Sequence, residues 1–108
     1  MQNGQELVRH KVEVSAVAEN MLYDHLDFVM NMGNLYAKKF MKEFHKAYDS
    51  LEYMPERFPF FKAGNIEEKA FRYVLFANWY MLVFHIEEDT VRIDYIFDAR
   101  QDPDNRNF

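Results

Sequence analysis

Residues 70–102 have the sequence AFRYVLFANWYMLVFHIEEDTVRIDYIFDARQD, and this stretch decides the fold. It contains three runs of apolar and β-branched residues, at 70–76, 80–87 and 90–97, separated by short segments suited to tight turns, Ala77-Asn78 and Glu88-Asp89. Strands that follow one another closely in sequence usually pair, so we expect an antiparallel three-stranded meander. One arginine lies near each end of the stretch, at Arg72 and Arg100.

Two helices are expected upstream of these strands. Residues 11–15 alternate in character and predict a short strand, after which Ser15 can cap a helix over 16–32. Gly33-Asn34 separates this helix from a second one over 35–53, with glycine as C-cap and asparagine as N-cap. A connection of two residues predicts an antiparallel helical hairpin.

The remaining segments complete a β-α-α-β-β-β order in one α+β domain covering residues 1–108. The helical hairpin is expected to pack on a small, mainly antiparallel sheet, with the first strand at its edge. Residues 55–69 contain two prolines and a glycine, which predict an ordered loop, and residues 1–8 are expected to form a loose arm.

The composition bounds the function classes. A 49% hydrophobic fraction in 108 residues is sufficient for a core, and no apolar run reaches the roughly 18–20 residues that span a bilayer. We therefore expect a cytoplasmic protein that does not enter a membrane. Without cysteine there is no thiolate ligand, and His25, His45 and His85 lack metal-ligand spacing, so neither metal nor cofactor is expected. The net charge of −5 argues against general nucleic-acid binding.

Several local motifs resemble one known family, the RelE/ParE toxins of bacterial type II toxin–antitoxin systems. The closing motif carries Asp98 where the family usually has histidine. The similar segments, spread from about residue 11 to residue 102, are Leu51-Glu52-Tyr53-Met54-Pro55-Glu56-Arg57-Phe58, Phe71-Arg72-Tyr73-Val74, Asn78-Trp79-Tyr80-Met81-Leu82-Val83-Phe84 and Ile96-Phe97-Asp98-Ala99-Arg100-Gln101-Asp102. The resemblance implies the same fold and an antitoxin partner, bound through an amphipathic helix in a groove or a strand added at the sheet edge.

The family resemblance implies one of two activities. RelE-like members cut mRNA on the ribosome with clustered cations and a proton donor, whereas ParE-like members poison DNA gyrase without cutting RNA. Arg72, Arg100 and His85 are the catalytic candidates if this chain is a nuclease. However, Val74 and Met81 occupy positions where RelE-like members commonly carry lysine and arginine, and neither tyrosine nor histidine follows residue 102. The resemblance is therefore closer to ParE-like gyrase inhibitors, with plasmid stabilisation as the associated role.

Other residues are candidates for contacts with a partner or target. Arg72 and Arg100 are expected to lie near one another at one end of the sheet, where they contact phosphate or a partner, or else tie an aspartate to the sheet. Trp79 is a candidate anchor. A stripe of lysines four residues apart on the second helix is either a docking face or a solvated surface: Lys38, Lys42 and Lys46. A homodimer and a non-toxic interaction domain of the same fold remain open alternatives.

Overall fold

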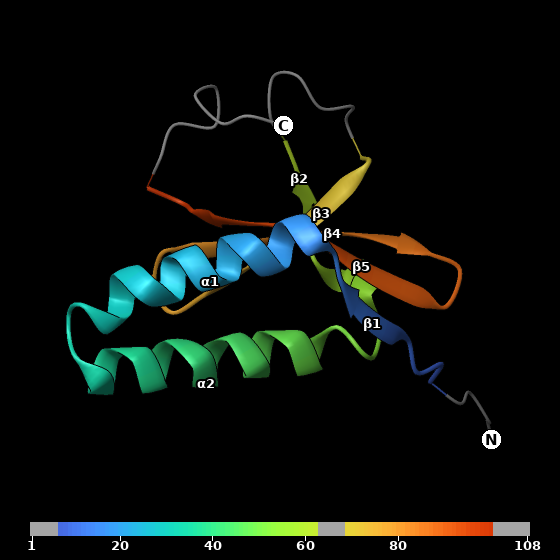
Figure 1. Cartoon of the computed structure of the whole chain (residues 1–108). Helices are drawn as coiled ribbons and strands as arrows, with labels where there is room; N and C mark the ends of the chain where they lie inside the picture. Colours follow the sequence, from blue (N-terminus) through green and yellow to red (C-terminus); the bar gives the residue numbers. More distant parts are fainter. Residues whose placement is uncertain (1–6, 63–68, 101–108) are drawn as a thin grey trace.

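Two helices lie side by side on one face of a five-stranded sheet (Figure 1). The structure is a computed structural model and describes residues 7–62 and 69–100. In chain order its elements are β1 (Lys11–Val14), α1 (Ala16–Met30), α2 (Asn34–Ser50), a short 3-10 helix (Pro55–Arg57), β2 (Phe60–Phe61), β3 (Phe71–Phe76), β4 (Tyr80–Glu87) and β5 (Thr90–Asp98). The predicted α+β class is confirmed. No helix in the described part of the chain is long and apolar enough to cross a bilayer.

The strands are ordered β1-β5-β4-β3-β2 across the sheet. β3, β4 and β5 form the expected antiparallel meander, and β1 joins one edge by pairing in parallel with β5. The predicted loop over 55–69 is corrected in its described part, because Phe60 and Phe61 pair with β3 as the opposite edge strand. Two paired residues are too short a run for sequence periodicity to detect. Most of the predicted N-terminal arm, the segment 63–68 and residues 101–108 lie outside the described residues.

The connection between the helices differs in detail from the prediction. α1 ends at Met30 and α2 ends at Ser50, two and three residues earlier than expected. Gly33, rather than Asn34, is the N-cap residue of α2, and no side chain caps this helix. Gly33 has φ of +133°, a conformation that side chains with a Cβ rarely adopt, so glycine is required here by the turn.

Ser15 links β1, α1 and β5. Its hydroxyl oxygen accepts a hydrogen bond from the backbone N–H of Ala18 at 3.0 Å and its O–H donates to the Asp94 carbonyl at 3.3 Å. Its own N–H donates to the Ile93 carbonyl at 3.0 Å. The predicted capping role of Ser15 is therefore confirmed, and the same side chain ties the start of α1 to the sheet.

Replacing Ser15 with alanine is expected to lower the free energy of unfolding by about 1 kcal/mol, the usual cost of losing an N-cap. Urea denaturation measures the change. Ser15→Asn keeps an oxygen that can accept from Ala18 and should lose less than the alanine variant. Equal losses in both variants would show that the cap contributes nothing.

A one-residue bulge in β5 determines which side chains share each face of the sheet. Val83 pairs with Tyr95 and Phe84 pairs with Ile93, so Asp94 is an extra residue without a partner on β4. The main core lies between sheet and helices and includes these buried residues: Phe40, Phe44, Leu82, Phe84, Val91, Ile93 and Ile96. A smaller cluster on the opposite face contains Phe61, Val83 and Phe97.

Candidate functional site

Arg72, in β3, holds the segment before β2 against the sheet. Its Nη1 donates to the backbone carbonyls of Glu56, at 2.8 Å, and Phe58, at 2.7 Å. Its Cζ lies 3.9 Å from the centre of the Phe60 ring, within cation–π range. No aspartate takes part in these contacts, so the expected arginine–aspartate tie is replaced by bonds to backbone. The Nη1 donors of Arg72 are therefore directed at the backbone of this segment.

His85, in β4, lies between two carboxylates. Its Nδ1 is 2.6 Å from Asp94 Oδ2 and its Nε2 is 2.7 Å from Glu87 Oε1. A neutral imidazole has one N–H, whereas the imidazolium has two, so only the protonated ring can donate to both acceptors. Asp94 follows Ile93, which faces the helices, so alternation along β5 places Asp94 on the same face as His85. The His85 and Phe71 rings also pack nearly perpendicular to one another, with ring centres 5.8 Å apart.

The surroundings shift the pKa values of this pair. Burial disfavours the charged imidazole and lowers the pKa of His85, but the hydrogen bonds with Asp94 and Glu87 outweigh burial, so the pKa is raised above 6.5. Burial raises the pKa of the Asp94 carboxyl, and the hydrogen bond with His85 offsets part of that rise. The raised pKa of His85 therefore favours the protonated imidazole, held by hydrogen bonds to two carboxylates.

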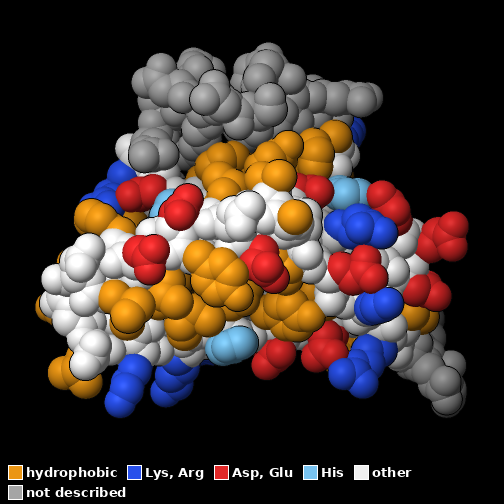
Figure 2. All heavy atoms as spheres, in the orientation of Figure 1, with side chains coloured by type: hydrophobic (Ala, Val, Ile, Leu, Met, Phe, Trp, Pro, Cys, Tyr) orange, Lys and Arg blue, Asp and Glu red, His pale blue; other side chains and the backbone are white. Residues whose placement is uncertain are grey.

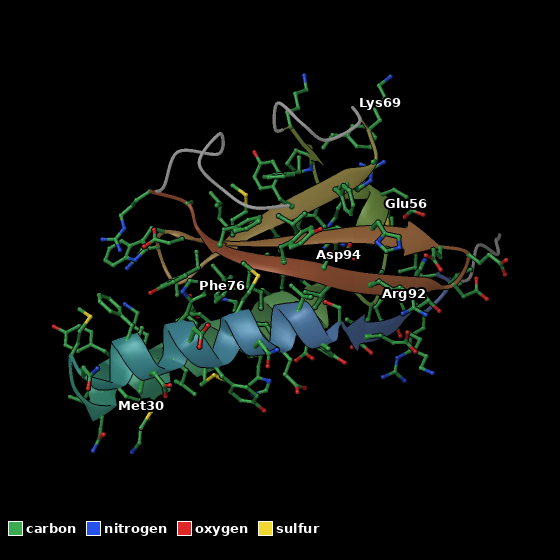
Figure 3. The ribbon with its side chains drawn as sticks, turned by 45° about the horizontal axis from the view of Figure 1, so that its top comes forward. Met30, Glu56, Lys69, Phe76, Arg92 and Asp94 are labelled. Atoms are coloured by element: carbon green, nitrogen blue, oxygen red, sulfur yellow. The ribbon has the colours of Figure 1, made fainter. Side chains whose placement is uncertain are left out.

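Arg92 extends the cluster to the first strand. It lies 3.3 Å from Glu13 on β1 and 3.6 Å from Glu87 on β4. Figure 2 shows positively and negatively charged side chains next to one another at the right-hand side of the molecule. Figure 3 shows Arg92 and Asp94 on the half of the sheet that lies near Glu56. Arg92 and Glu87 are exposed, so their pairing contributes little to stability.

Arg72 and His85 both line one open hollow of about 320 Å³, together with Glu56, Lys69 and Phe60. The hollow thus contains two of the three catalytic candidates. Of its cations, Arg72 donates to backbone carbonyls and His85 contacts two carboxylates, whereas Lys69 is exposed. In the described residues no group of three or more histidines and carboxylates is arranged to hold a metal ion.

Arg100 forms a compact contact group just after β5. Its Nε and backbone N–H donate to Asp98 Oδ1 at 3.0 Å each, and its Nη2 donates to Asp98 Oδ2 at 2.6 Å. Its Cζ lies 4.4 Å from the centre of the Trp79 ring. The hydrogen bonds with Arg100 lower the pKa of Asp98. Arg100 therefore ties an aspartate to the end of the sheet. From the sequence, this structural role was the alternative to a contact with phosphate or a partner.

The expectation that Arg72 and Arg100 lie together is wrong. Arg72 is at the start of β3, opposite Phe84 near the end of β4. Arg100 follows Asp98, which pairs with Tyr80 at the start of β4. In a three-stranded antiparallel meander the start of the first strand and the end of the third lie at opposite ends. The two arginines therefore belong to separate surfaces.

The lysines of α2 lie on its exposed side. Lys38, Lys42 and Lys46 are all exposed, and no carboxylate in the described residues lies within ion-pairing distance of them. Lys39 lines an apolar cavity of about 110 Å³ at the end of the helical hairpin, together with Trp79. Two of the sequence candidates, Trp79 and Arg100, thus lie near the first turns of α2 and far from His85.

Two features of the site were not predicted from the sequence. The first is Asp94 as the partner of His85, and the second is the cavity at the end of the helical hairpin. The sequence contains a signal for the bulge next to Asp94: Val91 and Ile93 occupy odd positions whereas Ile96 occupies an even one, which indicates an extra residue between them. It contains no signal for the contact of Asp94 with His85. The cavity joins residues distant in sequence, and no local pattern marks it.

Comparison with known proteins extends this description. No protein-family model matches the sequence. A search of curated proteins likewise finds no relative by sequence. Among solved structures, a chain described as "Chromosomal ParDE TA system from P. aeruginosa" superposes with a TM-score of 0.66 at 15% identity, covering 84% of this chain and 97% of that chain. The chain has a ParE-like fold.

This likeness agrees with the resemblance seen in the sequence. The superposition covers most of both chains, so the ParE-like fold accounts for the helical hairpin and the sheet together. At 15% identity it describes the path of the chain, and the chemistry of each surface follows from the contacts of its own residues.

Proposed function

We propose that this chain is the toxin of a type II toxin–antitoxin module and is neutralised by a cognate antitoxin. Two observations support the proposal. The chain shares its fold with a chain of the ParDE structure from P. aeruginosa, and its motifs follow the order of the RelE/ParE family from about residue 11 to residue 102.

The toxin acts by binding its target rather than by cutting RNA. The observation that carries this conclusion is that all three catalytic candidates make hydrogen bonds within the protein. Arg72 donates to backbone carbonyls, His85 is held by two carboxylates, and Arg100 is paired with Asp98. RNA cleavage needs a base, an acid and cations that are all directed at one phosphate. Here the three candidates make hydrogen bonds within the protein, and Arg100 lies at the opposite end of the sheet from Arg72.

The positions at which RelE-like members commonly carry further cations support the same conclusion. Val74 packs against the core between sheet and helices, whereas Met81 packs against the small cluster on the opposite face. Cationic side chains at these two positions would point to different sides of the sheet. Neither position therefore contributes to a single phosphate-binding site in this chain.

DNA gyrase is the target that the family resemblance favours for a ParE-like toxin without a catalytic site. Trp79, a residue that is 36% exposed and whose ring lies under the Arg100 guanidinium, is a suitable contact for a protein target. The exposed lysines of α2 offer a second contact surface of opposite charge to the acidic chain as a whole.

Brief induction in a bacterium tests the proposal. We expect growth arrest, intact mRNA 5′ ends, and loss of negative supercoiling in a reporter plasmid. Purified gyrase should lose supercoiling activity when the chain is added, and a Trp79→Ala variant should inhibit less. Thermal unfolding of Trp79→Ala provides the control that the variant is folded.

Each other outcome contradicts a different part of the proposal. Arrest with new mRNA ends in phase with codons would identify a ribosome-dependent nuclease. Arrest with intact mRNA and unchanged supercoiling would leave a binding toxin with a target other than gyrase. Normal growth with folded protein present would identify a non-toxic interaction domain.

A further inference from the structure

A small apolar cavity opens where the helical hairpin meets the β3–β4 turn. It has a volume of about 110 Å³, and its lining includes Val29, Met32, Tyr36 and Phe40 from the helices and Trp79 from the turn. A cavity of roughly 150 Å³ in an apolar core holds one benzene molecule, so this one has room for a single side chain of similar or smaller size.

The rim of the cavity is itself apolar and exposed. Met32, Tyr36 and Trp79 line the cavity, and Leu35 is the neighbour of Tyr36 in the first turn of α2; we call these four residues the hairpin-end patch. Leu35 is 81% exposed, Tyr36 57% and Met32 49%, although leucine and methionine are usually buried. Met30 is also exposed and lies at the same end of the molecule (Figure 3). Contiguous apolar patches around a cavity mark interaction sites more often than ordinary solvent-facing surface.

The charges next to the hairpin-end patch are positive. Lys39 lines the cavity, and Lys38 and Lys42 are exposed on the same first turns of α2. Figure 2 shows Lys and Arg side chains beside hydrophobic ones at the lower left, over the start of α2. The described residues place no carboxylate within ion-pairing distance of these lysines, so their charge is available to a partner.

We propose that the hairpin-end patch docks an acidic amphipathic helix of a partner protein, which inserts one large apolar side chain into the cavity. The inserted side chain supplies affinity by filling the cavity, and carboxylates one turn away pair with Lys38, Lys39 and Lys42. The inference concerns a binding surface and holds whether or not the chain is a toxin.

A second copy of this chain fits the patch poorly. A two-fold dimer brings the same patch of each subunit together, which would place Lys38, Lys39 and Lys42 against the same lysines of the partner. Like charges facing one another at an interface oppose association. An acidic helix meets both the apolar and the charged parts of the surface.

A synthetic peptide tests the inference directly. The probe is a helix of about 18 residues, roughly 27 Å long, built from glutamate and alanine with one central leucine anchor and a second leucine one turn away. Binding to the full chain is measured by titration calorimetry, and Trp79 fluorescence reports contact at the patch. We expect saturable binding, and replacing the anchor leucine with alanine should weaken it by about tenfold.

Matched charge reversals locate the site. Lys39→Glu should weaken binding by about tenfold, whereas Lys46→Glu, seven residues or about 10 Å further along the same exposed helix side, should change it by about twofold or less. A peptide with lysine in place of glutamate should bind wild type weakly and Lys39→Glu better. Circular dichroism confirms that both variants fold, which is expected because both lysines are exposed.

Three results would overturn the inference. The acidic peptide does not bind at all; or the two lysine reversals weaken binding equally, which means general electrostatic attraction; or the chain sediments as a dimer that Leu35→Glu dissociates, which means that a second copy covers the patch. Gyrase inhibition is measured separately, because Trp79 and the exposed lysines of α2 are also the proposed contacts for that target.

Discussion

Replacing Arg72 with methionine is expected to lower the free energy of unfolding by about 2–3 kcal/mol. Methionine keeps much of the aliphatic stem but donates no hydrogen bond, so the carbonyls of Glu56 and Phe58 lose a charged partner. The cation–π contact with Phe60 is lost as well. Urea denaturation followed by circular dichroism measures the change.

Two comparisons separate this structural role from a contact with the target. Arg72→Lys retains a charge but lacks the planar guanidinium, so its stability should lie between wild type and Arg72→Met. Arg100→Met removes an exposed arginine and should change stability much less. If Arg72→Met keeps full stability but no longer arrests growth, Arg72 is a functional contact, and its assignment to the fold is wrong.

The second large effect is a pH-dependent coupling between His85 and Asp94. A double-mutant cycle with His85→Gln and Asp94→Asn is expected to give a coupling energy of about 1–2 kcal/mol near pH 5.5, decreasing towards pH 9. The pKa of His85 is raised in the folded protein. The stabilisation is therefore fully present below the unfolded pKa of 6.5 and is lost as the pH rises through the folded value.

The neighbouring charges provide the control for this cycle. Glu87 and Arg92 also face His85, but both are exposed, so Glu87→Gln should change the coupling between His85 and Asp94 only slightly. A coupling energy that is constant across this pH range would mean that His85 stays neutral. The ion-pair description of the cluster would then be incorrect.

The sequence was sufficient to predict the elements but not all of their contacts. Ser15 as a helix cap, the hairpin of two helices, and the meander of three strands each follow from local signals that the structure bears out. The partners of Arg72 could not be predicted, because they are the backbone carbonyls of Glu56 and Phe58. Every residue has a backbone carbonyl, so the residue types do not indicate which ones accept hydrogen bonds.

The surfaces were less predictable than the fold because they depend on register. The separation of Arg72 and Arg100 follows from strand direction alone and was available from the predicted meander. The pairing of His85 with Asp94, in contrast, depends on the register between β4 and β5, and the cavity beside Trp79 depends on the packing of two helices against a turn. Neither geometry follows from the residue pattern of one element.

Position 94 combines a carboxylate with an extra residue in the strand. Regular alternation through all of β5, residue 94 included, would turn Tyr95 and Phe97 towards the helices and Ile96 away from them, and the bulge prevents this by absorbing one residue. A substitution at Asp94 removes the ion pair and keeps the bulge, whereas a single-codon deletion removes both and leaves a regular strand with the same residues on each face. Comparing the stabilities of these two variants would therefore separate the contribution of the bulge from that of the carboxylate.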